Sequence, residues 1–212
     1  MQFIKNYNYI NNSVQSHSKK TTLIVVSKNQ PLDKINSLIE ANHFHFGENR
    51  VQEAILKWGK IILKDPKLNL HLIGKLQSNK AKDAFEIFNY VHTLDNEKIA
   101  QIFSKLESMS FKKIKYFIQV NIADEPQKNG ISINKVSQFI KYCVEDLKLN
   151  VIGLMCIPPV EGDPTQYFKS LAERAKVNNL NELSMGMSND YDCAINNGAT
   201  FVRIGSKIFS DG

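Results

Sequence analysis

A lysine stands at the end of an apolar run near the start of the sequence. Lys28 follows Leu23-Ile24-Val25-Val26 and Ser27. Lysine is seldom placed on a buried strand, yet a lysine at a strand end can also simply reach solvent. A lysine amine held among apolar residues can react with an aldehyde to form a Schiff base. Position alone leaves both interpretations open, so the partners of Lys28 must decide between them.

Candidate partners stand near the other end of the chain. In the run 202–206, strand alternation places Arg203 on the face opposite its two neighbours, and Gly205 and Ser206 supply backbone N–H groups and a hydroxyl. Ser188 follows Gly186 and offers a second hydroxyl, with a plain helix N-cap as the alternative. These residues predict a cup for an anion such as phosphate.

The elements that must position these residues alternate between two patterns. Short apolar runs predict eight strands, each of the first seven followed by a helical stripe. The runs are 22–28, 44–47, 70–74, 90–94, 116–122, 151–157, 183–187 and 201–204. This order favours a single closed (β/α)8 barrel of the TIM type over an open doubly wound sheet. Because strand eight closes against strand one, Lys28 would lie beside the anion cup, a pairing that pyridoxal phosphate (PLP) needs.

Composition limits the class of protein. The 212 residues suit one domain, which we expect over 21–212 after a polar, fraying arm over 1–20. The net charge of +6 is scattered, and the densest run, 112–115, lacks a nucleic-acid motif, so we expect no nucleic-acid partner. No run approaches the ~20 apolar residues of a membrane span, and no signal peptide is evident. Three widely spaced cysteines suit a reducing compartment, and we expect a cytoplasmic protein.

Other polar residues leave alternatives open. Asn49 ends the second predicted strand, where its amide would bond the cofactor's ring hydroxyl or simply cap a helix. Capping also explains Ser78 or Asn79 in the segment 77–80. His43 and His45 would share one face of a strand, but no third histidine or carboxylate is evident beside them. We therefore expect packing or solvent for both histidines and predict no metal.

Six segments resemble the pyridoxal phosphate homeostasis protein family, over a stretch from about Leu23 to Phe209. They are Val25-Val26-Ser27-Lys28, the run 46–53 (FGENRVQE), the run 71–80 (HLIGKLQSNK), Gly153-Leu154-Met155, the run 183–188 (LSMGMS) and Val202-Arg203-Ile204-Gly205. The resemblance implies a single barrel like the amino-terminal domain of alanine racemase, the type III fold of PLP proteins, with PLP linked to Lys28. Three positions depart from the family pattern: Arg50 replaces a usual Tyr, Lys75 a usual Pro, and Ser210-Asp211-Gly212 a common Gly-x-Arg ending.

Together these observations predict a PLP-binding protein that holds the cofactor as a lysine Schiff base and releases it to PLP-dependent apoenzymes. The expected cofactor-binding residues are Lys28, Asn49, Ser188, Arg203, Gly205 and Ser206. We expect a monomer without a membrane partner and without catalytic residues. The alternative is a PLP-dependent amino acid racemase. Such an enzyme needs a second acid/base group, which related enzymes take from a second domain and a partner subunit, whereas this sequence stops soon after strand eight. A barrel for another phosphorylated metabolite is a third possibility.

Overall fold

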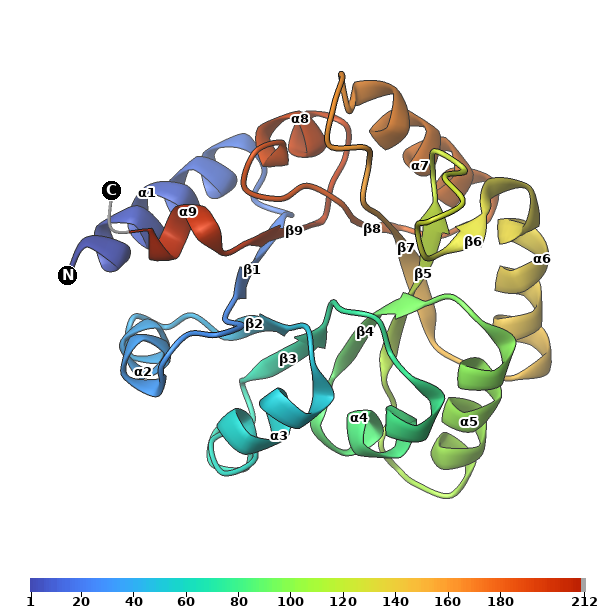
Figure 1. Cartoon of the computed structure of the whole chain (residues 1–212), viewed down its shortest axis with the longest axis horizontal. Coiled ribbons are helices and arrows are strands. Elements are labelled where there is room, and N and C mark those ends of the chain that lie inside the picture. Colours follow the sequence, from blue (N-terminus) through green and yellow to red (C-terminus); the bar gives the residue numbers. More distant parts are fainter. Residues whose placement is uncertain (211–212) are drawn as a thin grey trace.

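Eight parallel strands close into a barrel in the computed structural model, which describes residues 1–210 (Figure 1). The strands follow the circular order β1-β2-β3-β4-β5-β7-β8-β9, and β9 pairs with β1 so that Leu23 lies opposite Val202. Their bounds are β1 Thr22–Val26, β2 His45–Glu48, β3 Asn69–Leu72, β4 Tyr90–Leu94, β5 Lys115–Asn121, β7 Val151–Cys156, β8 Glu182–Ser184 and β9 Phe201–Ile204. The predicted closed barrel is confirmed, and the open-sheet alternative is wrong.

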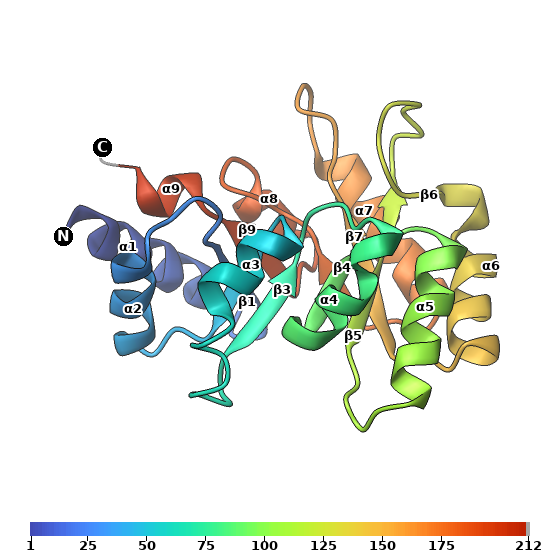
Figure 2. The same cartoon turned by 60° about the horizontal axis from the view of Figure 1, so that its bottom comes forward.

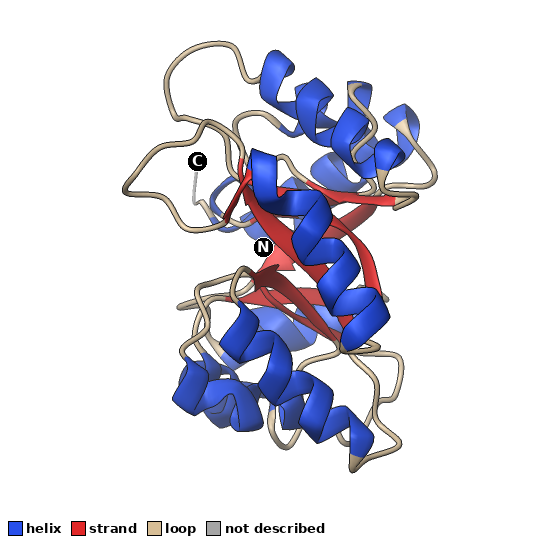
Figure 3. Cartoon of the chain, turned by 90° about the vertical axis from the view of Figure 1, so that its right-hand side faces the viewer, coloured by secondary structure: helices blue, strands red, loops and turns tan. Residues whose placement is uncertain are grey.

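Helices surround the barrel, with the strands inside them (Figure 3). The α-helices are α1 Gln2–His17, α2 Leu32–Glu40, α3 Val51–Trp58, α4 Ala81–Ile87, α5 Glu97–Ser108, α6 Val136–Lys141, α7 Thr165–Val177, α8 Tyr191–Asn196 and α9 Ser206–Phe209. Each helix of the outer layer buries one stripe; in α2 this stripe includes Ile35 and Leu38. The predicted helix over 133–147 consists of a 3₁₀ turn (Ile133–Lys135), α6 and a π turn (Tyr142–Asp146). In the described part of the chain, no helix is long and apolar enough to cross a bilayer.

The first twenty residues correct the expectation of a fraying polar arm. Most of them form α1, whose stripe of Phe3, Tyr7, Ile10 and Val14 is buried. The helix lies beside α8 and α9 (Figure 1), and Asn6 Nδ2 donates to the backbone carbonyls of residues 208 and 210, at 3.2 and 3.0 Å. Four apolar residues at helical spacing are enough to dock a helix that is otherwise polar.

Two loops rise from the carboxyl ends of the strands on the same face of the barrel (Figure 2). One joins β5 to β6 (Ile131–Ser132), a two-residue strand that pairs with the end of β5 outside the closed ring. The other, residues 157–164, joins β7 to α7. The sequence did not predict β6, because two residues are too few for a periodic pattern.

The barrel interior is aromatic and polar as well as aliphatic. Ile24, Tyr90, Phe117, Met155 and Phe201 pack together inside it. A second, larger apolar layer, which includes Val202 and Ile204, lies between the barrel and the helices. Arg203 stands between these two residues in the strand and is buried on the opposite face, in the barrel interior. The predicted alternation in β9 is confirmed.

Candidate functional site

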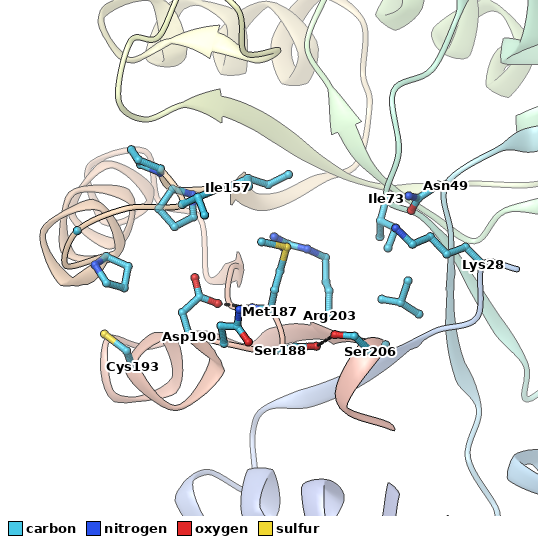
Figure 4. Close-up of a pocket in the computed structure, with 18 of the residues that line it drawn as sticks. Lys28, Asn49, Ile73, Ile157, Met187, Ser188, Asp190, Cys193, Arg203 and Ser206 are labelled. Atoms are coloured by element: carbon cyan, nitrogen blue, oxygen red, sulfur yellow. Dashed lines mark hydrogen bonds between the residues drawn. The ribbon is translucent and has the colours of Figure 1, made fainter. Parts of the chain in front are cut away.

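A cavity of about 790 Å³ opens at the carboxyl ends of the strands. Its wall includes all six predicted cofactor-binding residues: Lys28, Asn49, Ser188, Arg203, Gly205 and Ser206. In Figure 4, Lys28 and Asn49 lie on one side of the cavity and Met187 and Asp190 on the other, with Arg203 between them. The structure therefore brings together residues from the ends of four strands, β1, β2, β8 and β9.

Two carboxylates hold the residues on both sides of Lys28. Before it, the Ser27 hydroxyl donates to Glu48 Oε1 at 2.7 Å; after it, the Asn29 N–H donates to Glu53 Oε1 at 2.8 Å. That N–H is the main reason why the pKa of Glu53 is lowered. Asn29 has φ of 58°, a left-handed conformation that asparagine tolerates better than most residues. The chain thus turns sharply behind a lysine that is aimed into the cavity.

Glu48 is the centre of this support. It is completely buried, and its Oε1 also accepts from Lys57 Nζ at 3.0 Å and Trp58 Nε1 at 2.9 Å. Lys57 Nζ in turn donates to the Ser27 carbonyl at 2.8 Å. In the sequence, Glu48 stands out only as part of a family motif, and Lys57 has no predicted role. A carboxylate on a buried strand is itself a signal, because it must find buried donors.

The ends of β8 and β9 meet through two hydroxyls. Ser206 Oγ donates to Ser188 Oγ at 2.8 Å. Gly186 has φ of 92°, and a Cβ there would lie 2.6 Å from Ala194 Cβ, so only glycine lets this turn pack on α8. The N-cap of α8 is Asp190, so the N-cap alternative for Ser188 is wrong. Both serines are left with their hydroxyls at the cavity wall.

Arg203 is a buried cation without a carboxylate partner in the described structure. Its side chain is 5% exposed; Nη1 donates to Ser184 Oγ at 2.6 Å and Nη2 to the Cys156 carbonyl at 3.0 Å. Burial lowers the pKa of Arg203, but a guanidinium keeps its proton at neutral pH. An unpaired buried charge beside a cavity favours a ligand of opposite sign.

Asn49 lies in the cavity wall rather than at a helix cap. Helix α3 has Arg50 at its N-cap position and no side-chain capping bond, so the capping alternative for Asn49 is wrong. Gly74 fixes the backbone here, since a Cβ at that position would collide with the Asn49 carbonyl. The segment 78–80 is a 3₁₀ turn, also without a side-chain cap. Arg50 and Lys75, two departures from the family pattern, line a neighbouring hollow of about 650 Å³ instead.

The wall composition suits a flat phosphorylated aldehyde. Lys28 supplies a primary amine, the two serines supply hydroxyl donors, and Arg203 supplies a positive charge. Val26 and Ile73 add apolar surface on which a ring can lie. The volume falls within the range of small-ligand sites, about 300–1,000 Å³. These residues fit the chemistry of pyridoxal phosphate.

Comparison with known proteins agrees with this geometry. The family model for the N-terminal domain of alanine racemase matches residues 2–211. The pyridoxal phosphate homeostasis protein of Vibrio cholerae is 38% identical over 199 residues, which are 89% of this chain and 84% of that protein. The protein of the same name from Escherichia coli K12 is 34% identical over 200 residues, 90% and 86% of the two chains. The chain belongs to the pyridoxal phosphate homeostasis protein family.

Solved structures extend the likeness to the whole fold. PipY of Synechococcus elongatus PCC7942, with PLP bound, superposes with a TM-score of 0.87 at 30% identity and covers 99% of this chain and 100% of its own. The alanine racemase of Bartonella henselae, with covalently bound pyridoxal phosphate, has a TM-score of 0.76 at 13% identity. It covers 98% of this chain, which spans 58% of the racemase. At that identity the likeness shows the fold alone.

The histidines correct one expectation from the sequence. A third histidine does lie beside His45: His71 Nε2 is 3.0 Å from His45 Nδ1. His43 does not share a face with His45; its ring bonds the His45 carbonyl at 2.7 Å and faces Tyr7. In residues 1–210 no group of three or more such side chains could hold a metal ion. The family motifs contain only one of these histidines, His71, which explains why the sequence did not reveal their contact.

Proposed function

We propose that this protein binds pyridoxal phosphate in the cavity at the strand ends, holds it through a Schiff base with Lys28, and takes part in the intracellular homeostasis of the cofactor. The observation that carries the proposal is the common cavity of Lys28, Arg203 and the Ser188–Ser206 pair. Membership of a family whose relatives are named for this role, and the PLP-bound structure of PipY, support it.

Each side chain has a distinct part in this proposal. Bound pyridoxal phosphate supplies an aldehyde that condenses with an amine, and a phosphate with up to two negative charges. Lys28 holds the aldehyde carbon, while Ser188, Ser206 and the Gly205 backbone hold the phosphate. Arg203 attracts the ring or the phosphate from the barrel interior, and the Asn49 amide bonds the ring hydroxyl.

The cavity supports a carrier better than a racemase. Racemisation needs a second proton donor on the face opposite the lysine. The carboxylates that line the described cavity are already engaged: Asp190 Oδ1 accepts from the Met187 N–H at 2.6 Å, and Asp163 Oδ1 accepts from both the N–H and the hydroxyl of Thr165. No histidine or tyrosine is among the residues of the wall. We therefore propose binding and release without turnover.

We further propose that the protein acts as a cytoplasmic monomer and delivers the cofactor to PLP-dependent apoenzymes. Cys143, Cys156 and Cys193 are free thiols in the structure, which suits a reducing compartment.

The test has two stages. Purified protein is loaded with PLP, freed of excess by gel filtration and examined by visible absorption; Lys28→Ala is treated in the same way. We expect a retained chromophore that Lys28→Ala lacks. The loaded protein is then mixed with a PLP-dependent apoenzyme, and its regained activity is compared with that given by the same amount of free PLP. Absence of a retained chromophore would reject binding, and retention without transfer would reject delivery.

A further inference from the structure

Three histidine side chains form a hydrogen-bonded row through the barrel interior, and the row ends at Arg203. His45 Nδ1 lies 3.0 Å from His71 Nε2, and His71 Nδ1 lies 2.9 Å from His92 Nε2. His92 Nδ1 lies 2.8 Å from Ser184 Oγ, which accepts from Arg203 Nη1 at 2.6 Å. The five side chains come from β2, β3, β4, β8 and β9, so the row crosses the barrel from its half-exposed end at His45 to the cavity.

The inner part of the row is held rigidly among aromatic rings. His71 stacks on Tyr90, with centroids 4.2 Å apart and planes 18° apart, and His92 stacks on Phe117 at 4.3 Å and 18°. Both histidines are completely buried, and burial lowers their pKa well below the ordinary value. Stacked and neutral, these imidazoles find their hydrogen-bond partners along the row itself.

The charge of Arg203 fixes the direction of every bond in the row. A guanidinium only donates, so Ser184 Oγ accepts from it. The single proton of the Ser184 hydroxyl then has one acceptor in the described structure, His92 Nδ1. His92 must therefore carry its proton on Nε2 and donate to His71 Nδ1, and His71 donates from Nε2 to His45 in the same way. The opposite direction would leave the buried Ser184 proton without a partner, at a cost of about 1–3 kcal/mol.

The row also replaces the carboxylate that a buried arginine usually has. Each imidazole directs its Nδ1 lone pair towards Arg203, and a line of dipoles oriented in this way stabilises the cation. A carboxylate in this place would cancel the charge, whereas neutral imidazoles leave it available to an anionic ligand. At the outer end, burial and then the nearby charge of Lys115 lower the pKa of His45, which also favours the neutral form.

We propose that His45, His71 and His92 are positioning residues for Arg203: as a row of Nε2–H imidazoles they hold the Ser184 hydroxyl as an acceptor for the guanidinium and keep its charge facing the cavity. The role towards pyridoxal phosphate rests on the proposed function above. The polarity of the row does not, because it follows from the hydrogen bonds of the protein alone.

The first experiment measures the polarity without any ligand. Long-range ¹H–¹⁵N NMR of histidine-labelled apoprotein near pH 7.5 reports which ring nitrogen of each histidine carries the proton, with single His→Phe variants for assignment. We expect Nε2–H for His45, His71 and His92. A proton on Nδ1 of His71 or His92, or a charged imidazole at either position, would overturn the proposal. The tautomers are measured in the wild-type apoprotein, so the result does not depend on whether any variant binds PLP.

The second experiment separates positioning from mere packing. His92→Phe keeps a flat ring against Phe117 but removes the acceptor, and His92→Asn keeps an acceptor near the Nδ1 position. His43→Phe is the matched control. His43 is also buried, but its ring bonds Tyr7 and the backbone carbonyl of His45, and it makes none of the ring-to-ring bonds of the row. The readouts are the Arg203 guanidinium ¹H–¹⁵N signals in the apoprotein and the equilibrium affinity for PLP.

For His92→Phe we expect broadened or shifted Arg203 signals and an affinity about tenfold lower, because the buried Ser184 hydroxyl loses its acceptor. His92→Asn should bind within about threefold of wild type, and His43→Phe should leave the Arg203 signals in place. Unchanged Arg203 signals in His92→Phe, or equal losses in His92→Phe and His43→Phe, would show that the row only packs. If wild type itself binds no PLP, the proposed function is wrong. The tautomers and the Arg203 signals would still show whether the histidine row positions Arg203.

Discussion

Ser206 and Ser188 share a hydrogen bond of 2.8 Å, although they follow different strands and stand 18 positions apart. The glycines beside them make the contact possible: Gly186 packs its turn on α8, and a Cβ at Gly205 would lie 3.0 Å from Val26 Cβ. The pair thus marks the place where β8, β9 and β1 converge. Two hydroxyls in contact can turn towards an incoming anion together, because each is both donor and acceptor.

The serine pair predicts a strong effect of charge. Ser206→Asp places a carboxylate where the proposal places a phosphate, and two such charges about 4 Å apart repel by several kcal/mol. We expect the affinity for PLP to fall at least about a hundredfold. Ser108→Asp, at the exposed end of α5, is the control and should bind normally. Equilibrium titration measures both, and equal affinities would reject the phosphate site.

Lys28 should carry the covalent bond to the cofactor. Reduction of the loaded protein with borohydride converts a Schiff base into a stable secondary amine, which peptide mass mapping locates. We expect the label on Lys28, and Lys28→Ala should lose it. Lys207→Ala is the matched control, because that exposed lysine follows Ser206 but stacks on the Tyr191 ring outside the cavity wall. A label spread over surface lysines would contradict the assignment.

The engaged carboxylates of the cavity predict weak chemistry at the α-carbon of amino acids. Loaded protein with L- or D-alanine in deuterated water should give interconversion and α-hydrogen exchange no faster than free pyridoxal phosphate. The reason is that no histidine or tyrosine lines the described cavity, and hydrogen bonds from Thr165 lower the pKa of Asp163, which makes that carboxyl a poor proton donor. Chiral chromatography and mass spectrometry follow the two processes. Turnover well above the free cofactor, abolished by Lys28→Ala, would instead establish an enzyme.

The buried histidines predict a loss of stability in mild acid. Burial lowers the pKa of His43 from 6.5 to about 4. Between about pH 6.5 and 4, this histidine therefore binds a proton in the unfolded chain but not in the folded chain. The free energy of unfolding falls as the pH drops through this range. Below about pH 4 both states bind the proton, and the contribution of His43 no longer changes. Removing one such histidine should reduce the slope by up to about 1.4 kcal/mol per pH unit.

Urea unfolding of wild type and His43→Gln at pH 7, 6 and 5 measures that slope. Because His71 and His92 are shifted in the same direction, several histidines add to the wild-type slope. Asn12→Gln, at an exposed position of α1 that carries no titratable group, is the control and should leave the slope unchanged. A wild-type slope that His43→Gln does not reduce would contradict a neutral buried His43.

Sequence reasoning succeeded where a short-range pattern carries the information. Alternation along β9 was sufficient to place Arg203 inside the barrel, since neighbouring side chains of a strand must face opposite ways. The sequence did not predict α1. Its four buried apolar residues are separated by polar ones, and their role becomes clear only when the surface that they cover is known. The histidine row was out of reach for another reason: His45, His71 and His92 stand 26 and 21 positions apart, and only the pairing of β2, β3 and β4 brings them together.

The meeting of β9 with β1 has a consequence for the order of folding. Thr21 Oγ1 donates to the Ala199 carbonyl across 178 positions, and Asn6 reaches Ile208 across 202. Contacts of such sequence separation carry the largest loop-closure entropy, so this seam is expected to form late, after the more local β/α units have paired. Lys28 stands on one side of the seam and Ser206 on the other. A partly folded chain would thus have most of its barrel but no lysine beside the cup, and appearance of the ligand chromophore during refolding would report the final step of closure.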